Sequence, residues 1–223
     1  MGILRRAVPL ALAAVGAVVA YRAGRTAQLA YGSTEAERAA VLPGDELTPD
    51  ADLVATRAVG IDAPPARVWP WLVQLGQGRG GFYSYDALEN LVGCDIHSAD
   101  AVVEEWQRLE VGDEVRLAPE FALKVAVLEP ARALVLYGGA PVDDDGPMPF
   151  DFTWAFVVEP ADDGVASRLV VRERYVYRTS WAGRMVEPVS WVSFVMTERM
   201  LRGIRDRAER TPSGAAASTS GPR

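Results

Sequence analysis

Residues 53–72 read LVATRAVGIDAPPARVWPWL, and within this stretch a strand pattern changes into a helix start. From Leu53 to Ile61, leucine, valine and isoleucine are mixed with threonine and arginine, which is typical of a strand. The segment Asp62-Ala-Pro-Pro65 follows, and proline is favoured in the first turn of a helix. We therefore expect a strand followed directly by a short helix through Val68 and Leu72.

The chain after this stretch predicts one more short helix, a run of strands and a long helix. Tyr83–Leu91 has apolar residues at helical spacing. The apolar period then changes to two, which predicts strands at Glu114–Leu117, Ala122–Leu128, Ala133–Tyr137, Phe150–Val158 and Ser167–Tyr177. Met185–Ala208 shows the spacing of a long amphipathic helix.

This order of elements predicts an α+β fold in which a curved antiparallel β-sheet wraps around the long C-terminal α-helix. Two short helices follow the first strand, and an apolar helix precedes the domain. A sheet that closes on a helix leaves a cavity between the two, and small apolar molecules bind in cavities of this kind.

Residues 1–31 are predicted to form a membrane anchor or signal segment outside the folded core. The uncharged run Ala7–Tyr21 has two arginines on each side. It is shorter than the about 20 apolar residues of a transmembrane helix. A membrane anchor with arginines that reach the interface, a cleaved signal peptide and a buried helix all stay open. We expect a single N-terminal anchor that places the protein at a membrane, with a secreted protein after cleavage as the alternative.

The remaining chain divides by composition into three parts. Residues 32–52, with several glycines and prolines among acidic residues, are expected to be a linker. Residues 53–210 form the predicted domain, and the low-complexity residues 211–223 (TPSGAAASTSGPR) are expected to be a disordered tail.

Composition excludes several classes of protein. The net charge is −7 although residues 1–31 carry four arginines and no acid, so the rest is strongly acidic, which argues against nucleic acid as a partner. One cysteine and one histidine exclude an intrachain disulfide and make a zinc site improbable. Gly76, Gly78 and Gly81 match G-x-G-x-x-G, but the βαβ context of a dinucleotide site is missing, so we expect no cofactor and no metal.

Residues 53–208 resemble the SRPBCC superfamily of START-like lipid carriers and polyketide cyclases. The resemblance rests on IDAPPARVWPWL (61–72), WQRLEVGDEVRL (106–117) and the terminal helix. Residues 76–107 resemble a bacterial, often membrane-anchored subgroup to which no activity is attached. The resemblance implies a helix-grip fold with a cavity for hydrophobic or aromatic molecules, and it implies no shared catalytic motif.

The best candidate site lies beside the glycine turn, where polar and aromatic residues gather between Tyr83 and His97. Helical spacing places Tyr85 and Glu89 on one face. If that face points into the cavity, burial would raise the pKa of Glu89, which could then transfer protons together with Tyr83, Tyr85 or His97. The alternative is that these residues are solvated, cap a helix or fill the core.

We therefore take Glu89, His97 and Tyr85 as catalytic candidates. The predicted ligand-binding residues are Tyr83, Tyr85, Glu89, Asn90, His97, Trp106, Arg116 and Trp154. Arg172 and Arg174 would also line the cavity if their strand faces pointed inward, and a register shift of one residue would reverse that assignment.

Three functions follow from these residues. The first is the binding of a hydrophobic small molecule, such as a lipid, polyketide or isoprenoid, near a membrane. The second is a cyclase-, dehydratase- or hydrolase-type enzyme that uses Glu89. The third is a structural or partner-binding membrane protein with a filled cavity.

Overall fold

The computed structural model describes residues 2–91, 93–141 and 148–210, with the backbone alone for residues 2–15 and 139–141. The predicted tail, residues 211–223, lies outside the described residues. The elements are α1 (Gly2–Leu29), α2 (Glu35–Ala39), β1 (Leu53–Ile61), α3 (Pro65–Val73), α4 (Asp86–Leu91), β2 (Glu114–Ala118), β3 (Phe121–Glu129), β4 (Ala133–Pro141), β5 (Phe150–Ala161), β6 (Ala166–Tyr177) and α5 (Ala182–Glu209). Short 3-10 helices are η1 (Asp45–Leu47), η2 (Glu104–Gln107) and η3 (Asp162–Gly164).

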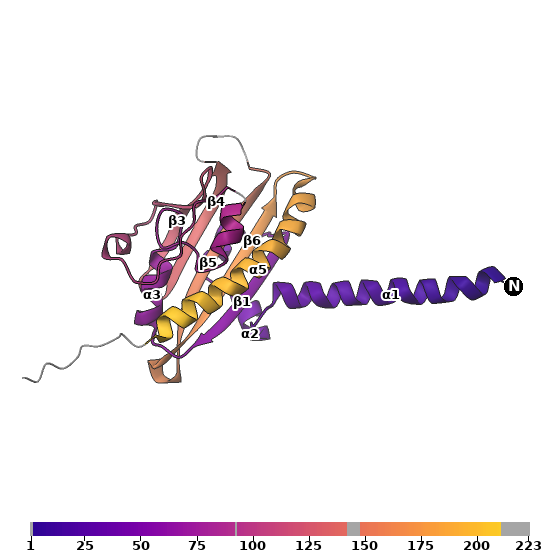
Figure 1. Cartoon of the computed structure of the whole chain (residues 1–223), viewed down its shortest axis with the longest axis horizontal. Helices are drawn as coiled ribbons and strands as arrows, with labels where there is room; N and C mark the ends of the chain where they lie inside the picture. The colour runs from indigo at the N-terminus through magenta and orange to yellow at the C-terminus, as the bar shows by residue number, and fades with distance from the viewer. Residues whose placement is uncertain (1, 92, 142–147, 211–223) are drawn as a thin grey trace, which may run out of the picture.

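The strands form one antiparallel sheet of six, in the order β1-β6-β5-β4-β3-β2. Strands β2 to β6 are a meander, and β1 closes the far edge by pairing with β6. The long helix α5 crosses one face of the sheet (Figure 1). The α+β class, the antiparallel sheet and the long C-terminal helix are therefore confirmed.

The main hydrophobic core lies between α5, α3 and the sheet. It contains Leu72 of α3, Phe156 of β5, Val171 of β6 and Met200 of α5, each at most 1% exposed. Burial of this apolar surface is the dominant stabilising contribution. Alternation along the strands explains why these residues share one face, because successive side chains of a strand point to opposite sides.

The second short helix begins three residues later than the sequence predicts. Tyr83 has a φ of 56°, in the left-handed region that a right-handed helix does not use. The chain therefore turns at Tyr83, and α4 starts at Asp86. This turn decides which side chains of the candidate cluster reach the cavity.

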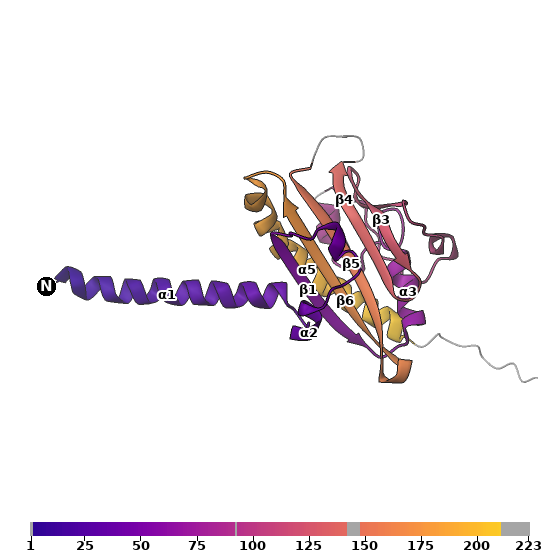
Figure 2. The same cartoon turned by 180° about the vertical axis from the view of Figure 1, so that it is seen from behind.

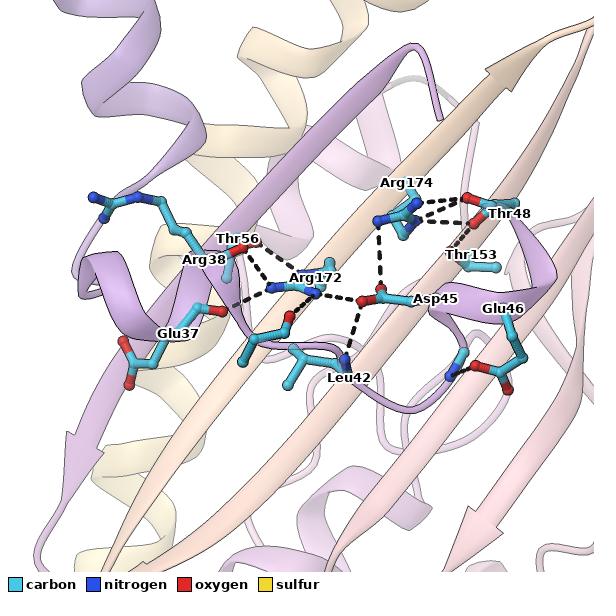
Figure 3. A network of polar contacts seen from close by, with 12 residues as sticks. Glu37, Arg38, Leu42, Asp45, Glu46, Thr48, Thr56, Thr153, Arg172 and Arg174 are labelled. Carbon is cyan, nitrogen blue, oxygen red and sulfur yellow. Dashed lines mark hydrogen bonds and ion pairs between the residues drawn. The ribbon is translucent and has the colours of Figure 1, made fainter. Parts of the chain in front are cut away.

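Residues 32–52, which we call the strap, run across the sheet face opposite α5 (Figure 2). Arg172 of β6 is 2% exposed and donates hydrogen bonds to the carbonyls of Glu37 and Ala40 and to the carboxylate of Asp45 (Figure 3). Arg174 binds the strap through the carbonyl of Thr48. Both arginines thus point away from α5, so neither lines the cavity and the polar side of β6 lies under the strap.

The N-terminal segment differs from its prediction. The chain is helical from Gly2 to Leu29, and α1 extends away from the body at its N-terminal end (Figure 1). Among the residues that the structure describes, no helix combines the length and apolar character needed to cross a membrane. The predicted apolar membrane anchor and the membrane localisation derived from it are therefore wrong.

The end of α1 is also polar and contacts the folded domain. Arg25 pairs with Glu187 of α5 and donates to Ser190 Oγ at 2.6 Å. Gln28 is 1% exposed and donates to the carbonyl of Ser190 at 2.6 Å. The aromatic rings of Tyr21 and Trp191 lie 6.5 Å apart. This part of α1 is therefore bound to the folded domain instead of lying outside it.

Candidate ligand-binding cavity

A cavity of about 780 Å³ lies between α5 and the sheet, beside α4. Its walls are largely apolar and include Phe82, Leu88, Leu117, Trp154, Met196 and Met200. A second space of about 320 Å³ shares Leu117, Trp154, Val189 and Ser193 with it and continues to Phe150, Phe152 and Tyr175. We call the two together the cavity. Volumes of several hundred Å³ with mostly apolar walls are typical of small-molecule sites.

The cavity opens between α4 and α5. Val189, Val192 and Val195 line it from α5 yet are 50%, 63% and 46% exposed. Leu88 and Leu91 line it from α4 and are 51% and 81% exposed. These five residues, which we call the mouth, leave apolar surface in contact with water. Apolar surface gathered at the entrance of a cavity is typical of a ligand-binding groove.

Glu89 of α4 supplies a carboxyl group to the cavity wall. Its Oε2 atom is buried and has no hydrogen-bond partner among the described residues. Burial, assisted by the neighbouring carboxylate of Asp86, raises the pKa of Glu89 to about 7. Near neutral pH this group is therefore a mixture of acid and carboxylate, the condition in which a carboxyl group can give or take a proton.

Trp154 of β5 lines the same cavity and carries a hydrogen-bond donor. Its Nε1 atom is buried and lacks an acceptor among the described residues. A buried N–H group without a partner costs free energy, typically about 1–3 kcal/mol. A bound ligand with a suitably placed oxygen or nitrogen would remove that cost, so Trp154 offers a directional contact as well as an apolar wall.

A buried ion pair forms part of the cavity floor. Glu173 lines the smaller space, and its Oε1 accepts a hydrogen bond from Arg57 Nη1 at 2.7 Å. Ser193 Oγ donates to the same carboxylate at 2.8 Å, and Thr197 Oγ1 donates at 3.0 Å. The carboxylate thus receives donors from β1 and α5. Burial next to this carboxylate raises the pKa of Tyr175 well above its usual value.

Of the predicted site residues, the structure places Glu89 and Trp154 in the cavity wall. Tyr83 is 1% exposed and does not line it, because its hydroxyl donates to the carbonyl of Trp71 at 3.1 Å. Asn90 exchanges two hydrogen bonds with the backbone of Ile96 and thereby holds the loop after α4. Tyr83 and Asn90 therefore stabilise the local fold.

The other four predicted residues also lie outside the cavity lining. The His97 side chain is 82% exposed, with its Nε2 3.0 Å from Asp95 Oδ1, and Tyr85 is 40% exposed. Arg116 lies on the outside of β2 beside Glu114, and Trp106 lies in η2, where its carbonyl accepts from Arg79. His97, Tyr83 and Tyr85 thus lie outside the lining that contains Glu89, so the geometry leaves Glu89 as the candidate for proton transfer.

Sequence reasoning missed the polar lining of α5 and the ion pair. Ser193 and Thr197 lie four residues apart within an otherwise apolar helix face, and Ser190, three residues earlier, contacts α1 instead of the cavity. That regular series of hydroxyls was the available signal, because polar residues on a buried helix face require partners. Arg57, in the middle of a largely apolar strand, was a second signal of a buried charge that needs a counter-ion.

Comparison with known proteins finds solved structures of similar fold, but no matching family and no matching curated protein. A hypothetical protein of Helicobacter pylori is 12% identical, with a TM-score of 0.47 over 77% of this chain and 96% of its own. A protein of Chromobacterium violaceum is 14% identical, with a TM-score of 0.42 over 71% and 98%. CalU16 of Micromonospora echinospora is 13% identical, with a TM-score of 0.33 over 70% and 83%. At such identities and scores these similarities carry no functional assignment.

Proposed function

We propose that this protein binds an apolar small molecule in the cavity between α5 and the sheet, as members of the SRPBCC superfamily with a helix-grip fold do. The observation that supports the proposal is a cavity of about 780 Å³ whose largely apolar walls include Glu89 and Trp154. Two of their polar atoms, Glu89 Oε2 and Trp154 Nε1, are buried and unpartnered within the described part of the chain. A ligand with an apolar body and one hydrogen-bonding group fits these walls.

A neutral, environment-sensitive dye such as Nile red tests this proposal. The dye fluoresces on entering an apolar cavity, so titration of the full chain should give saturable binding. Val189 lines both parts of the cavity and is 50% exposed, so Val189→Trp fills space without loss of a core contact. We expect this variant to bind the dye at least about tenfold more weakly, the equivalent of about 1.4 kcal/mol.

Val165→Trp is the matched control, because Val165 is 70% exposed and lies outside the cavity lining. It should bind the dye as the unaltered protein does. Cys94, the one cysteine of the chain, lines the cavity and gives a second measurement. A bound ligand should slow its alkylation by a thiol reagent. Absence of saturable dye binding together with unchanged alkylation of Cys94 would refute the proposal.

Proton transfer to or from the bound molecule is a second candidate function, supported by the raised pKa of Glu89 at about 7. A carboxyl group with a pKa near the working pH is effective as a general acid or base. Glu89→Gln should then abolish turnover of a substrate while dye binding persists. Retained turnover in this variant would exclude the role.

A further inference from the structure

The cavity has an unusual balance of charge for an apolar site. Among its described lining residues, Glu89 and Glu173 are acidic, and no lysine, arginine or histidine is present. Arg57 already neutralises Glu173 through the 2.7 Å contact, and Ser193 and Thr197 complete that carboxylate's hydrogen bonds. Within the described lining, Glu89 is therefore the carboxyl group that has no cation of its own.

The groups around Glu89 add further negative charge. Asp86 lies one turn earlier on α4, and both of its carboxylate oxygens accept hydrogen bonds from Ser98, at 2.6 and 2.7 Å. Cys94 lies on the other side, where its backbone N–H donates to the Glu89 carbonyl at 3.2 Å and burial raises the pKa of its thiol. The surroundings thus favour a positive charge next to Glu89 and disfavour a second negative one.

The aromatic wall supports the same preference. Phe82 and Trp154 both line the cavity, with ring centroids 6.1 Å apart and planes tilted by 39°. The face of an aromatic ring attracts a cation, most strongly for tryptophan, and the attraction grows when water is excluded. An acidic group and aromatic rings in one apolar cavity form a suitable environment for an alkylammonium group.

We propose that the cavity selects apolar molecules that carry a basic nitrogen over those that carry a carboxylate, and that Glu89 pairs with the nitrogen. This inference rests on the proposed function and defines its ligand class. The ammonium N–H donates to the carboxylate of Glu89, whose side chain lines the cavity and whose Oε2 has no partner within the described residues. Where Glu89 is neutral before binding, its proton passes to water as the ion pair forms.

A carboxylate ligand meets the opposite conditions. Its charge would be desolvated in an apolar cavity beside Glu89 and Asp86, with no basic side chain in the described lining to compensate. The indole N–H of Trp154 is a donor without a partner in the described lining, whereas the hydroxyl of Ser84 already donates to the carbonyl of Met196 at 2.9 Å. Neutral donors stabilise a carboxylate less than a cation does, because charge-assisted pairs are roughly twice as strong. Fatty acids are therefore expected to be poor ligands.

Decylamine, decanol and decanoic acid form a matched series that differs in the terminal group alone. Each is titrated, below the concentration at which it self-associates, as a competitor of Nile red on the full chain at pH 7. Decylamine should bind at least about tenfold more tightly than decanoic acid, the equivalent of about 1.4 kcal/mol, with decanol between them. Glu89→Gln should weaken decylamine about tenfold and leave decanol within about twofold.

Asp95→Asn is the control for this substitution, because it also removes one negative charge but at a side chain that is 84% exposed and outside the cavity lining. It should leave all three affinities unchanged. The amine preference would be overturned if decanoic acid competed as well as decylamine, or if Glu89→Gln did not lower the affinity for decylamine. In either case, binding of decanol would still support the binding of apolar ligands in the cavity. If neither the dye nor any of the three compounds bound, the proposed function would fail together with this inference.

Discussion

Arg57 of β1 and Glu173 of β6 form an ion pair of 2.7 Å between Nη1 and Oε1, with side chains that are 1% and 2% exposed. Arg57 also donates through Nε to the carbonyl of Gln28, at the end of α1. Ser193 and Thr197 of α5 donate to the same Glu173 carboxylate. One buried ionic contact thus connects the N-terminal helix, the edge of the sheet and the helix that covers the cavity.

Arg57→Met tests how much of the fold depends on this contact. The substitution leaves a buried carboxylate without its cation, so we expect the free energy of unfolding to fall by about 3–5 kcal/mol. The measurement is urea unfolding followed by tryptophan fluorescence. Arg57→Met combined with Glu173→Met should recover part of this loss, because it removes both charges.

Arg116→Met is the control, since Arg116 faces Glu114 at 3.7 Å with both side chains more than 40% exposed. A surface pair of this kind contributes about 0–1 kcal/mol, so the control should unfold nearly as the unaltered protein does. A loss of less than about 1 kcal/mol in Arg57→Met would show that water reaches Glu173 in the folded state.

The strap is predicted to depend on Asp45. Its Oδ2 accepts from Arg172 Nη1 at 2.6 Å and from the backbone N–H of Leu42 at 3.0 Å (Figure 3). Asp45→Asn removes the charge that Arg172 requires, so we expect faster protease cleavage within residues 32–52 and a loss of about 1–3 kcal/mol in the free energy of unfolding. Limited proteolysis with mapping of the cut sites measures the first effect.

Asp50→Asn is the matched control, an exposed aspartate of the same strap. It should be cleaved at the rate of the unaltered protein. If Asp45→Asn were no more susceptible than Asp50→Asn, the backbone carbonyls that Arg172 also binds would suffice to hold the strap.

Glu89 predicts a specific dependence of stability on pH. Its pKa rises from 4.5 to about 7 on folding, so the folded state holds this proton more tightly than the unfolded state does. Below pH 4.5 Glu89 is protonated in both states and does not lower the free energy of unfolding. As the pH rises from 4.5 through about 7, burial of the ionised carboxylate lowers the free energy of unfolding more and more. Glu89→Gln should raise the free energy of unfolding by on the order of 1 kcal/mol at pH 8, after allowance for solvent screening of a half-exposed group.

At pH 4.5 the same variant should match the unaltered protein, and the difference between the two pH values is the measurement. Urea unfolding at both values supplies it, and Asp95→Asn serves as the control because its carboxylate is exposed. An equal effect of Glu89→Gln at both pH values would mean that Glu89 is solvated in the folded state.

Much of the fold could be predicted from the sequence because its signals are local. The period-two segments predicted β2 to β6, and the apolar spacing predicted α5, with differences at their ends alone. Tyr83 shows where local reasoning stops: it lies within a helical pattern, yet the chain adopts a left-handed conformation there. Arg172 shows a second limit of local reasoning. Its face of β6 is buried because the strap covers it, and the strap lies far away in the sequence.

The candidate site could be predicted in part, for the same reason. Glu89 and Trp154 line the cavity as predicted residues, whereas Tyr85, which helical spacing placed on the face of Glu89, precedes α4 and lies outside the lining. His97 lies near Glu89 in the sequence, but its side chain is 82% exposed, on a loop that the bonds between Asn90 and Ile96 hold. The membrane anchor was wrong because no described helix is long and apolar enough to cross a membrane. The contact of Arg25 with Glu187, which binds the end of α1 to α5, is a long-range one that no local pattern shows.

Gly203 of α5 and Gly24 of α1 are both helical glycines, and alanine should have opposite effects at the two sites. A Cβ atom at Gly203 would lie 2.2 Å from the carbonyl oxygen of Tyr83, where the left-handed turn before α4 presses against α5. Alanine is favoured over glycine in a helix by about 0.8–1.0 kcal/mol, but this overlap costs more. We expect Gly203→Ala to lower the free energy of unfolding by about 1–3 kcal/mol.

At Gly24 the nearest atom to a Cβ is the Trp191 ring at 3.7 Å, an ordinary contact. Gly24→Ala should therefore raise the free energy of unfolding by about 0.5–1 kcal/mol. Urea unfolding of the two variants measures the difference. Because Tyr83 directly precedes Ser84 in the cavity wall, Gly203→Ala should also weaken Nile red binding, whereas Gly24→Ala should not. Equal stabilisation by both substitutions would mean that the turn at Tyr83 does not approach α5 as closely as the structure places it.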